Sequence, residues 1–74
     1  MIEIYGKFFC SYCDQAKALC EARGVPYTYK ELDKDFTKEQ LLEIFPNAKT
    51  FPQVKIDNTN IGGFAELKEH LDKQ

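Results

Sequence analysis

Glycine and proline residues divide the chain into short segments, and these breaks limit the possible folds more than any other feature. Gly6 ends a first apolar–polar stretch, and Gly24 with Pro26 ends the helical pattern that follows. Pro46 closes a second helical stretch, and Gly62-Gly63 separates the last two elements. No apolar run approaches the roughly 18 residues of a membrane span. The chain is therefore expected to form several short elements.

The residue pattern within each segment predicts its secondary structure. Residues 1–5 alternate apolar and polar side chains, which predicts a strand. From Ser11 onward apolar residues recur every three or four positions, which predicts a helix. Thr37 and Gln40 form a capping box that opens a second helix. The full expected order is strand 1–5, helix 11–23, strand 27–32, helix 38–45, strand 53–56, strand 59–61 and a helix from 64 through 71.

The order of these elements predicts the fold class. A strand, helix and strand in succession form a right-handed crossover between parallel strands. The Asp57-Asn58 turn adds an antiparallel pair. We therefore expect an α/β protein with a mixed four-stranded sheet in the order β-α-β-α-β-β-α, flanked by three helices. A chain of 74 residues is expected to form one domain, residues 1–74, with a small core.

Composition narrows the functional classes. Ten basic and twelve acidic residues give a net charge of −2 without a basic block, so nucleic acid is not an expected partner. The N-terminal residues lack the features of a secretory signal, and without an expected span a membrane is not an expected partner either. The chain has three cysteines, and an odd number does not suit a framework of structural disulfides. We expect a cytoplasmic protein.

Cys10 and Cys13 form a C-x-x-C pair where the first strand gives way to the first helix. In open α/β sheets active sites gather at the carboxyl ends of the strands, which places Cys10 in such a region. A zinc site needs about four ligands. Only Cys20 and His70 could complete the set, and Cys20 lies about 10 Å farther along the helix. A structural disulfide is also a poor explanation, because a ring with two intervening residues constrains the chain little.

A redox role explains the pair better. The N-terminus of a helix stabilises a thiolate, and Lys7 adds a nearby cation, so Cys10 is the expected nucleophile. Cys13 lies one helical turn later, within disulfide reach, and can resolve a mixed disulfide formed on Cys10.

Three motifs together resemble the glutaredoxins, small members of the thioredoxin-fold superfamily. They are K-F-F-C-S-Y-C at residues 7–13, T-F-P-Q at 50–53 and I-G-G-F at 61–64, followed by Leu67. The resemblance covers residues 1–72, and the short form looks most like the glutaredoxins of bacteriophages. If so, the expected location is the cytoplasm of the host cell.

The resemblance implies a monomeric, glutathione-dependent thiol–disulfide oxidoreductase acting on disulfide-containing or glutathionylated proteins. Glutathione would be the co-substrate, and Cys10 and Cys13 the redox-active disulfide. By the same resemblance Pro52 is cis, the Phe51 backbone pairs with glutathione, and the helix beginning at Gly63-Phe64 receives its γ-glutamyl carboxylate. The implied glutathione-binding residues are Lys7, Tyr12, Thr50, Phe51, Pro52, Gly63, Phe64 and Ala65.

Two departures from the family pattern leave alternatives open. Ala65 stands where many glutaredoxins carry an aspartate facing glutathione, and Glu66 is a candidate to replace it. A thioredoxin-like reductase that does not use glutathione is therefore one alternative. Ser11 replaces the commonest proline of the motif, and some family members with C-S-Y-C hold a [2Fe-2S] cluster. The second alternative is a homodimer in which Cys10 and glutathione bind such a cluster.

Several other residues have simpler structural interpretations. Cys20 lies on the apolar stripe of the first helix and is expected in the core. Lys49 and His70 are expected at the surface. Aromatic residues adjoin each of the three motifs, and any that stay exposed would form an apolar collar around Cys10 that suits a protein substrate. They are Phe9, Tyr12, Phe51 and Phe64.

Overall fold

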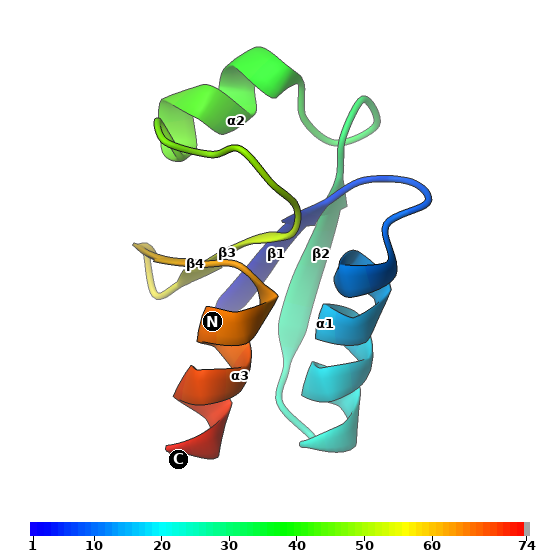
Figure 1. Ribbon diagram of the computed structural model, residues 1–74, viewed down its shortest axis with the longest axis vertical. Helices are drawn as coiled ribbons and strands as arrows, with labels where there is room; N and C mark the ends of the chain where they lie inside the picture. Colours follow the sequence, from blue (N-terminus) through cyan, green and yellow to red (C-terminus); the bar gives the residue numbers. More distant parts are fainter. Residues whose placement is uncertain (74) are drawn as a thin grey trace.

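A computed structural model describes residues 1–73 and contains the seven predicted elements in the predicted order (Figure 1). The strands are β1 (Ile2–Gly6), β2 (Tyr27–Glu31), β3 (Gln53–Ile56) and β4 (Thr59–Gly62). The helices are α1 (Ser11–Ala22), α2 (Lys38–Ile44) and α3 (Phe64–Asp72). The predicted boundaries differ from the observed ones by no more than one residue. Leu32 lies outside β2, for example, because it forms an isolated bridge with Phe36 around a turn.

The sheet is mixed, as the element order predicted. Its strand order is β2-β1-β3-β4, with β1 parallel to β2 and antiparallel to β3. β3 and β4 form the predicted antiparallel hairpin. Asp57 and Asn58 at its turn have φ of 50° and 68°, the left-handed conformation that a two-residue turn of type I′ requires.

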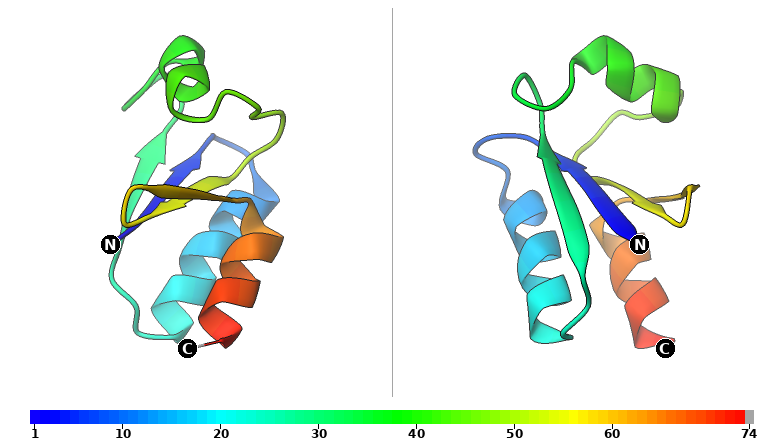
Figure 2. Two further views of the ribbon diagram at one scale, coloured as in Figure 1. Left: turned by 90° about the vertical axis from the view of Figure 1, so that its left-hand side faces the viewer. Right: turned by 180° about the vertical axis from the view of Figure 1, so that it is seen from behind.

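The three helices cover the sheet unequally (Figure 2). α1 and α3 lie side by side on one face of the sheet. Beneath them is the main core, in which Ile4, Val54 and Leu67 have no exposed surface. α2 lies apart from this pair, beyond the end of β1 and β2. It packs through Leu41 onto a second, aromatic cluster that includes Tyr5.

The Thr37–Gln40 capping box is present at the start of α2. The Thr37 side chain accepts a hydrogen bond from the Gln40 N–H at 3.2 Å, and the Gln40 side chain accepts one from the Thr37 N–H at 2.8 Å. These bonds fix the first turn of a helix that has little sheet beneath it. Within residues 1–73, no helix combines the length and apolar character needed to cross a membrane.

Candidate redox site

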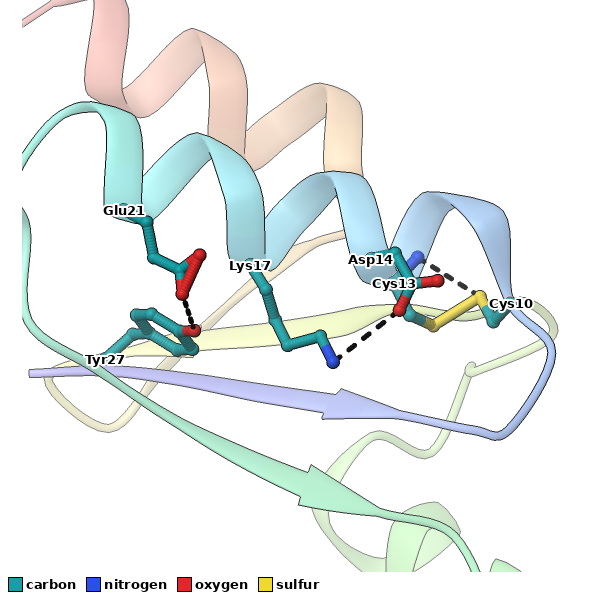
Figure 3. Close-up of polar contacts among 6 residues, drawn as sticks. All are labelled: Cys10, Cys13, Asp14, Lys17, Glu21 and Tyr27. Carbon is teal, nitrogen blue, oxygen red and sulfur yellow. Dashed lines mark hydrogen bonds and ion pairs between the residues drawn. A yellow bond between two sulfur atoms is a disulfide. The ribbon is translucent and has the colours of Figure 1, made fainter.

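Cys10 is the N-cap residue of α1. Its backbone is extended, and its Sγ accepts a hydrogen bond from the Cys13 N–H at 3.2 Å. The sulfur thus takes the place of the oxygen that usually caps a helix and lies next to the positive end of the helix dipole. Cys10 and Cys13 form a disulfide with Cα atoms 5.2 Å apart, within the usual range (Figure 3).

The two sulfur-bearing residues differ in exposure. The Cys10 residue is 9% exposed, whereas Cys13 has no exposed surface and packs beneath the first turn of α1. An attacking thiolate must reach a sulfur along the S–S axis. An approach from solvent therefore meets Cys10 before Cys13, which agrees with the predicted roles of nucleophile and resolving thiol.

The loop between β1 and Cys10 carries two exposed aromatic rings. Phe9 is 96% exposed and Phe8 67% exposed, and their rings meet edge to face at 4.8 Å between centroids. Phe9 has φ of 55°, a conformation that a bulky residue rarely adopts. Tyr12 is exposed as well, whereas Phe51 and Phe64 are half-buried. The sequence prediction of an aromatic collar missed Phe8, although it directly precedes Phe9.

A groove of about 430 Å³ lies beside the first turn of α1 and is here called the Tyr12 groove. Its wall includes the rings of Tyr12 and Phe64, whose centroids are 5.8 Å apart. The Phe51–Pro52 peptide is cis, as the resemblance implied. The residues that line the groove are Tyr12, Thr50, Phe51, Pro52, Gly63, Phe64, Ala65 and Glu66. The fold thus brings together every predicted glutathione-binding residue except Lys7, together with Glu66.

Lys7 lies close to Phe51 but does not line the Tyr12 groove. Its Nζ is 5.6 Å from the centroid of the Phe51 ring, and it lines a neighbouring pocket. Thr50 and Phe51 line both this pocket and the Tyr12 groove.

Unused backbone groups border the Tyr12 groove. Among the described residues, no hydrogen bond uses the N–H or C=O of Phe51, or the N–H of Phe64 and Ala65 in the first turn of α3. Glu66 reaches back to the start of the helix, where its Oε1 accepts the Gly63 N–H at 2.7 Å. A Cβ at Gly63 would lie 3.2 Å from the Pro52 carbonyl oxygen, a tight contact that a larger residue could relieve only by a small shift of the backbone.

A charged contact flanks the disulfide on the sheet side of α1. Lys17 pairs with Asp14 at 3.5 Å (Figure 3). The Lys17 Nζ is also 4.2 Å from the centroid of the Tyr29 ring. Burial raises the pKa of the Tyr29 hydroxyl, and neighbouring carboxylates raise it further.

Cys20 and His70, the other candidate metal ligands of the sequence, lie far from this centre. Cys20 is a fully buried free thiol, as predicted, and burial raises its pKa. His70 is half-buried near the opposite end of α3. Among residues 1–73, no group of three or more His, Cys, Asp or Glu residues could hold a metal ion. The iron–sulfur alternative requires a second chain and stays a prediction.

The family model that matches this sequence and the relatives that resemble it are all glutaredoxins. The family model described as Glutaredoxin matches residues 2–61. Glutaredoxin 3 of Escherichia coli K12 is 36% identical over 66 residues, covering 89% of this chain and 80% of its own. Glutaredoxin 1 of Rickettsia felis is 40% identical over 76 residues, covering 99% and 72%.

Solved glutaredoxin structures have a fold similar to that of this chain. Reduced Escherichia coli glutaredoxin superposes with a TM-score of 0.84 at 28% identity, covering 99% of this chain and 94% of its own. A buckwheat glutaredoxin–glutathione complex gives a TM-score of 0.80 at 28% identity, covering 97% and 69%.

Proposed function

Because the chain belongs to the glutaredoxin family of thiol–disulfide oxidoreductases, we propose that Cys10 and Cys13 reduce protein disulfides and glutathione mixed disulfides, with glutathione as the electron donor. The observation that carries this assignment is the unequal exposure of the two cysteines at the helix N-terminus. A substrate can reach Cys10 from solvent, whereas Cys13 stays buried until it attacks the mixed disulfide formed on Cys10.

In the first half of the reaction, the Cys10 thiolate attacks a sulfur of the substrate disulfide. A Cys10–substrate disulfide forms, and the other substrate sulfur leaves as a thiolate that takes up a proton. Cys13, deprotonated, then attacks Cys10 Sγ and releases the second substrate thiol. The product is the Cys10–Cys13 disulfide seen in the structure. The substrate has gained two electrons and two protons.

In the second half, glutathione restores the dithiol. One glutathione thiolate attacks Cys10 Sγ and displaces the Cys13 thiolate, which becomes protonated. A second glutathione thiolate attacks the glutathione sulfur of this mixed disulfide, and the Cys10 thiolate leaves. The helix N-terminus stabilises the charge on this leaving group. The sum is one protein disulfide and two glutathione molecules converted to a protein dithiol and glutathione disulfide.

The Tyr12 groove is the proposed glutathione site. Glutathione is an extended tripeptide whose backbone can pair with the unused N–H and C=O of Phe51. The free N–H groups of Phe64 and Ala65 suit its γ-glutamyl carboxylate. Glu66 lines the same end of the groove and offers a carboxylate to the neighbouring ammonium group, a role that Ala65 cannot perform. Lys7 is proposed to meet the glycyl carboxylate at the other end.

A coupled assay tests this function. Wild type, Cys10→Ser and Cys13→Ser are supplied with a glutathione mixed disulfide of a small thiol, with glutathione and its reductase as the electron source. Wild type is expected to turn over, Cys10→Ser to be inactive, and Cys13→Ser to keep activity, because glutathione itself can resolve a mixed disulfide on Cys10.

The alternatives give other results. A wild type that is inactive with glutathione but reduces protein disulfides when supplied with a dithiol would be thioredoxin-like. A brown protein purified without oxygen in the presence of glutathione would indicate the cluster-binding homodimer. The monomeric state and the cytoplasmic location stay predictions. Gel filtration of the reduced protein tests the first of them.

A further inference from the structure

Two exposed phenylalanines lie directly before the nucleophile. Phe8 is 67% exposed and Phe9 96% exposed, whereas the other four phenylalanines of the chain are buried or half-buried. Single apolar residues at a surface need no explanation, but these two are adjacent and their rings are in contact, with 4.8 Å between the centroids. We call Phe8 and Phe9 the phenylalanine pair.

The loop that carries the phenylalanine pair holds it in place. This loop joins β1 to α1 and projects from the molecule on the side away from α3 (Figure 1). It is anchored at both ends, because the Gly6 carbonyl accepts the Leu32 N–H at 2.8 Å and Cys10 caps α1. The edge-to-face contact between the rings restricts both side chains further. Rings fixed in this way lose little conformational entropy when a partner covers them.

The backbone of Phe9 is unfavourable for a residue with a large side chain. Its φ of 55° lies in the left-handed region, which glycine and asparagine adopt at a lower cost. Residues in such conformations cluster at active sites and ligand-binding segments, where the surrounding structure maintains them. The stability of the loop alone therefore does not explain a phenylalanine at this position.

Neither the core nor the proposed glutathione site accounts for the phenylalanine pair. Within residues 1–73, Phe8 and Phe9 belong to neither of the two core clusters. Of the described residues, those that line the Tyr12 groove and the pocket that includes Lys7 do not include them. Both ends of glutathione are thus assigned to other residues. The two rings are left for a part of the substrate other than glutathione.

The reaction indicates which part of the substrate lies over the rings. A thiolate attacks a disulfide along the S–S axis, so the attacked cysteine of a protein substrate must come to Cys10 Sγ. That cysteine carries neighbouring residues of its own chain past the residues that adjoin Cys10, which are Phe9 and Ser11. The phenylalanine pair offers two uncharged rings. An aliphatic or aromatic side chain beside the substrate cysteine matches this surface.

We propose that the phenylalanine pair binds an apolar side chain next to the reactive cysteine of a protein substrate, while the substrate sulfur lies at Cys10. The proposal rests on the proposed function and names the protein disulfides and glutathionylated sites that the enzyme selects. They are those in which leucine, valine, phenylalanine or a similar residue flanks the cysteine. A small glutathione mixed disulfide lacks such a side chain and does not use the pair.

Glutathionylated peptides test this selection. Two peptides are identical except that leucine or serine adjoins the cysteine, and each is made with that residue before and after the cysteine. For wild type, kcat/KM is expected to be about tenfold higher for leucine than for serine in at least one of the two placements, because the leucine side chain leaves water. Added salt should not reduce this preference, since no charges take part. Equal values for leucine and serine in both placements would overturn the proposal.

Variants of the phenylalanine pair locate the effect. Phe9→Asn removes one ring and keeps a residue that tolerates the left-handed backbone, and Phe8→Ser removes the other ring. Each is expected to lower the leucine preference about threefold, and the double variant to abolish it, with turnover of the small mixed disulfide within about twofold of wild type. Phe8→Leu is the matched control, because it keeps an apolar side chain and should keep most of the preference. Equal losses in Phe8→Leu and Phe8→Ser, or equal losses on peptide and small substrate, would overturn the proposal.

A trapped complex separates this proposal from the proposed function. In the reduced Cys13→Ser variant, the Cys10 thiolate attacks the sulfur of a leucine peptide activated with thionitrobenzoate, which leaves as a thiolate, and a Cys10–peptide disulfide accumulates. Nuclear Overhauser effects are expected between the leucine methyl groups and the rings of the phenylalanine pair. If these contacts are seen but glutathione does not support turnover, the catalytic assignment fails and the docking site stands. If turnover is normal and the methyl groups contact neither ring, the docking site is wrong.

Self-association is the other use of an exposed apolar pair, and sedimentation of the reduced protein measures it. Wild type is expected to sediment as a monomer at the concentrations of the peptide assay. A dimer that Phe9→Asn abolishes would assign the phenylalanine pair to an interface between copies of the chain and would overturn the proposal.

Discussion

Cys10 and Cys20 occupy opposite ends of α1 and differ in every property that controls thiol chemistry. Cys10 caps the helix, accepts a hydrogen bond from the Cys13 N–H and keeps 9% of its surface exposed. Cys20 lies in the last turn with no exposed surface, and burial raises the pKa of its thiol. One helix therefore holds a reactive sulfur and an inert one, and position along the helix decides between them.

The main core, to which Cys20 belongs, should contribute more to stability than the exposed first turn of α1. Leu67 packs in the same cluster as Cys20 and has no exposed surface. Leu67→Ala is expected to lower the free energy of unfolding by about 2 to 5 kcal/mol, because it leaves a cavity in a small core. Tyr12→Ala, at the exposed end, is expected to change it by only about 0.5 kcal/mol. Urea denaturation measures both, and comparable losses would refute this division of the molecule.

Alkylation should distinguish the two thiols directly. In the reduced protein at pH 7, iodoacetamide is expected to modify Cys10 at least about 100-fold faster than Cys20, since the thiolate is the nucleophile and burial keeps Cys20 protonated. Mass spectrometry of the digested protein gives both rates. Rapid labelling of Cys20 without loss of the native circular dichroism spectrum would show that the last turn of α1 opens to solvent.

Alkaline pH should destabilise the Cys20 end. Folding raises the pKa of the Cys20 thiol above its ordinary value of 9.0, because the buried thiolate loses its hydration. The associated stability is therefore complete below pH 9 and is lost as the pH rises through the pKa of the folded state. The urea midpoint of the oxidised protein, in which Cys20 is the free thiol, should fall more steeply above pH 9 than that of Cys20→Ala.

The Cys20→Ala variant controls for other groups. Burial also raises the pKa of Tyr27 and Tyr29, and their contribution remains in the variant, so only the difference between the two curves reports on Cys20. Parallel curves would show that Cys20 is not the source of the slope.

The same variant should have the smallest effect on function. Cys20→Ala is expected to cost about 1 kcal/mol of stability and to leave turnover of a small mixed disulfide within about twofold of wild type. Cys20 lies in the core away from Cys10 and the Tyr12 groove, so it has no role in the proposed reaction. A large loss of turnover in a folded Cys20→Ala variant would contradict the separation between the two ends of the helix.

Much of the fold could be predicted from the sequence because its signals are local. Gly24, Pro46 and the Asp57-Asn58 turn mark element ends wherever the rest of the chain lies. The position of Cys10 was also predictable, since a cysteine that directly precedes a helix lies at its N-terminus. The disulfide with Cys13 needs only one helical turn.

The features that escaped prediction depend on contacts between distant segments. Lys38 and Leu42 belong to α2, and only the packing of α2 beyond the end of the sheet brings them to Phe51. The Glu66–Gly63 hydrogen bond could have been suspected from the three-residue spacing of a capping box, although glycine supplies no side chain to complete one. Nothing in the local pattern indicates that Phe9 takes a left-handed backbone conformation.

The exposed position of Phe9 suits a fluorescent reporter of the redox state. The chain contains no tryptophan, and Phe9 is 96% exposed and directly precedes the disulfide. Phe9→Trp would place a single indole next to a group that quenches its emission when oxidised. Fluorescence at that one position would then follow the opening and closing of the Cys10–Cys13 bond in real time, without added dye or coupling enzyme.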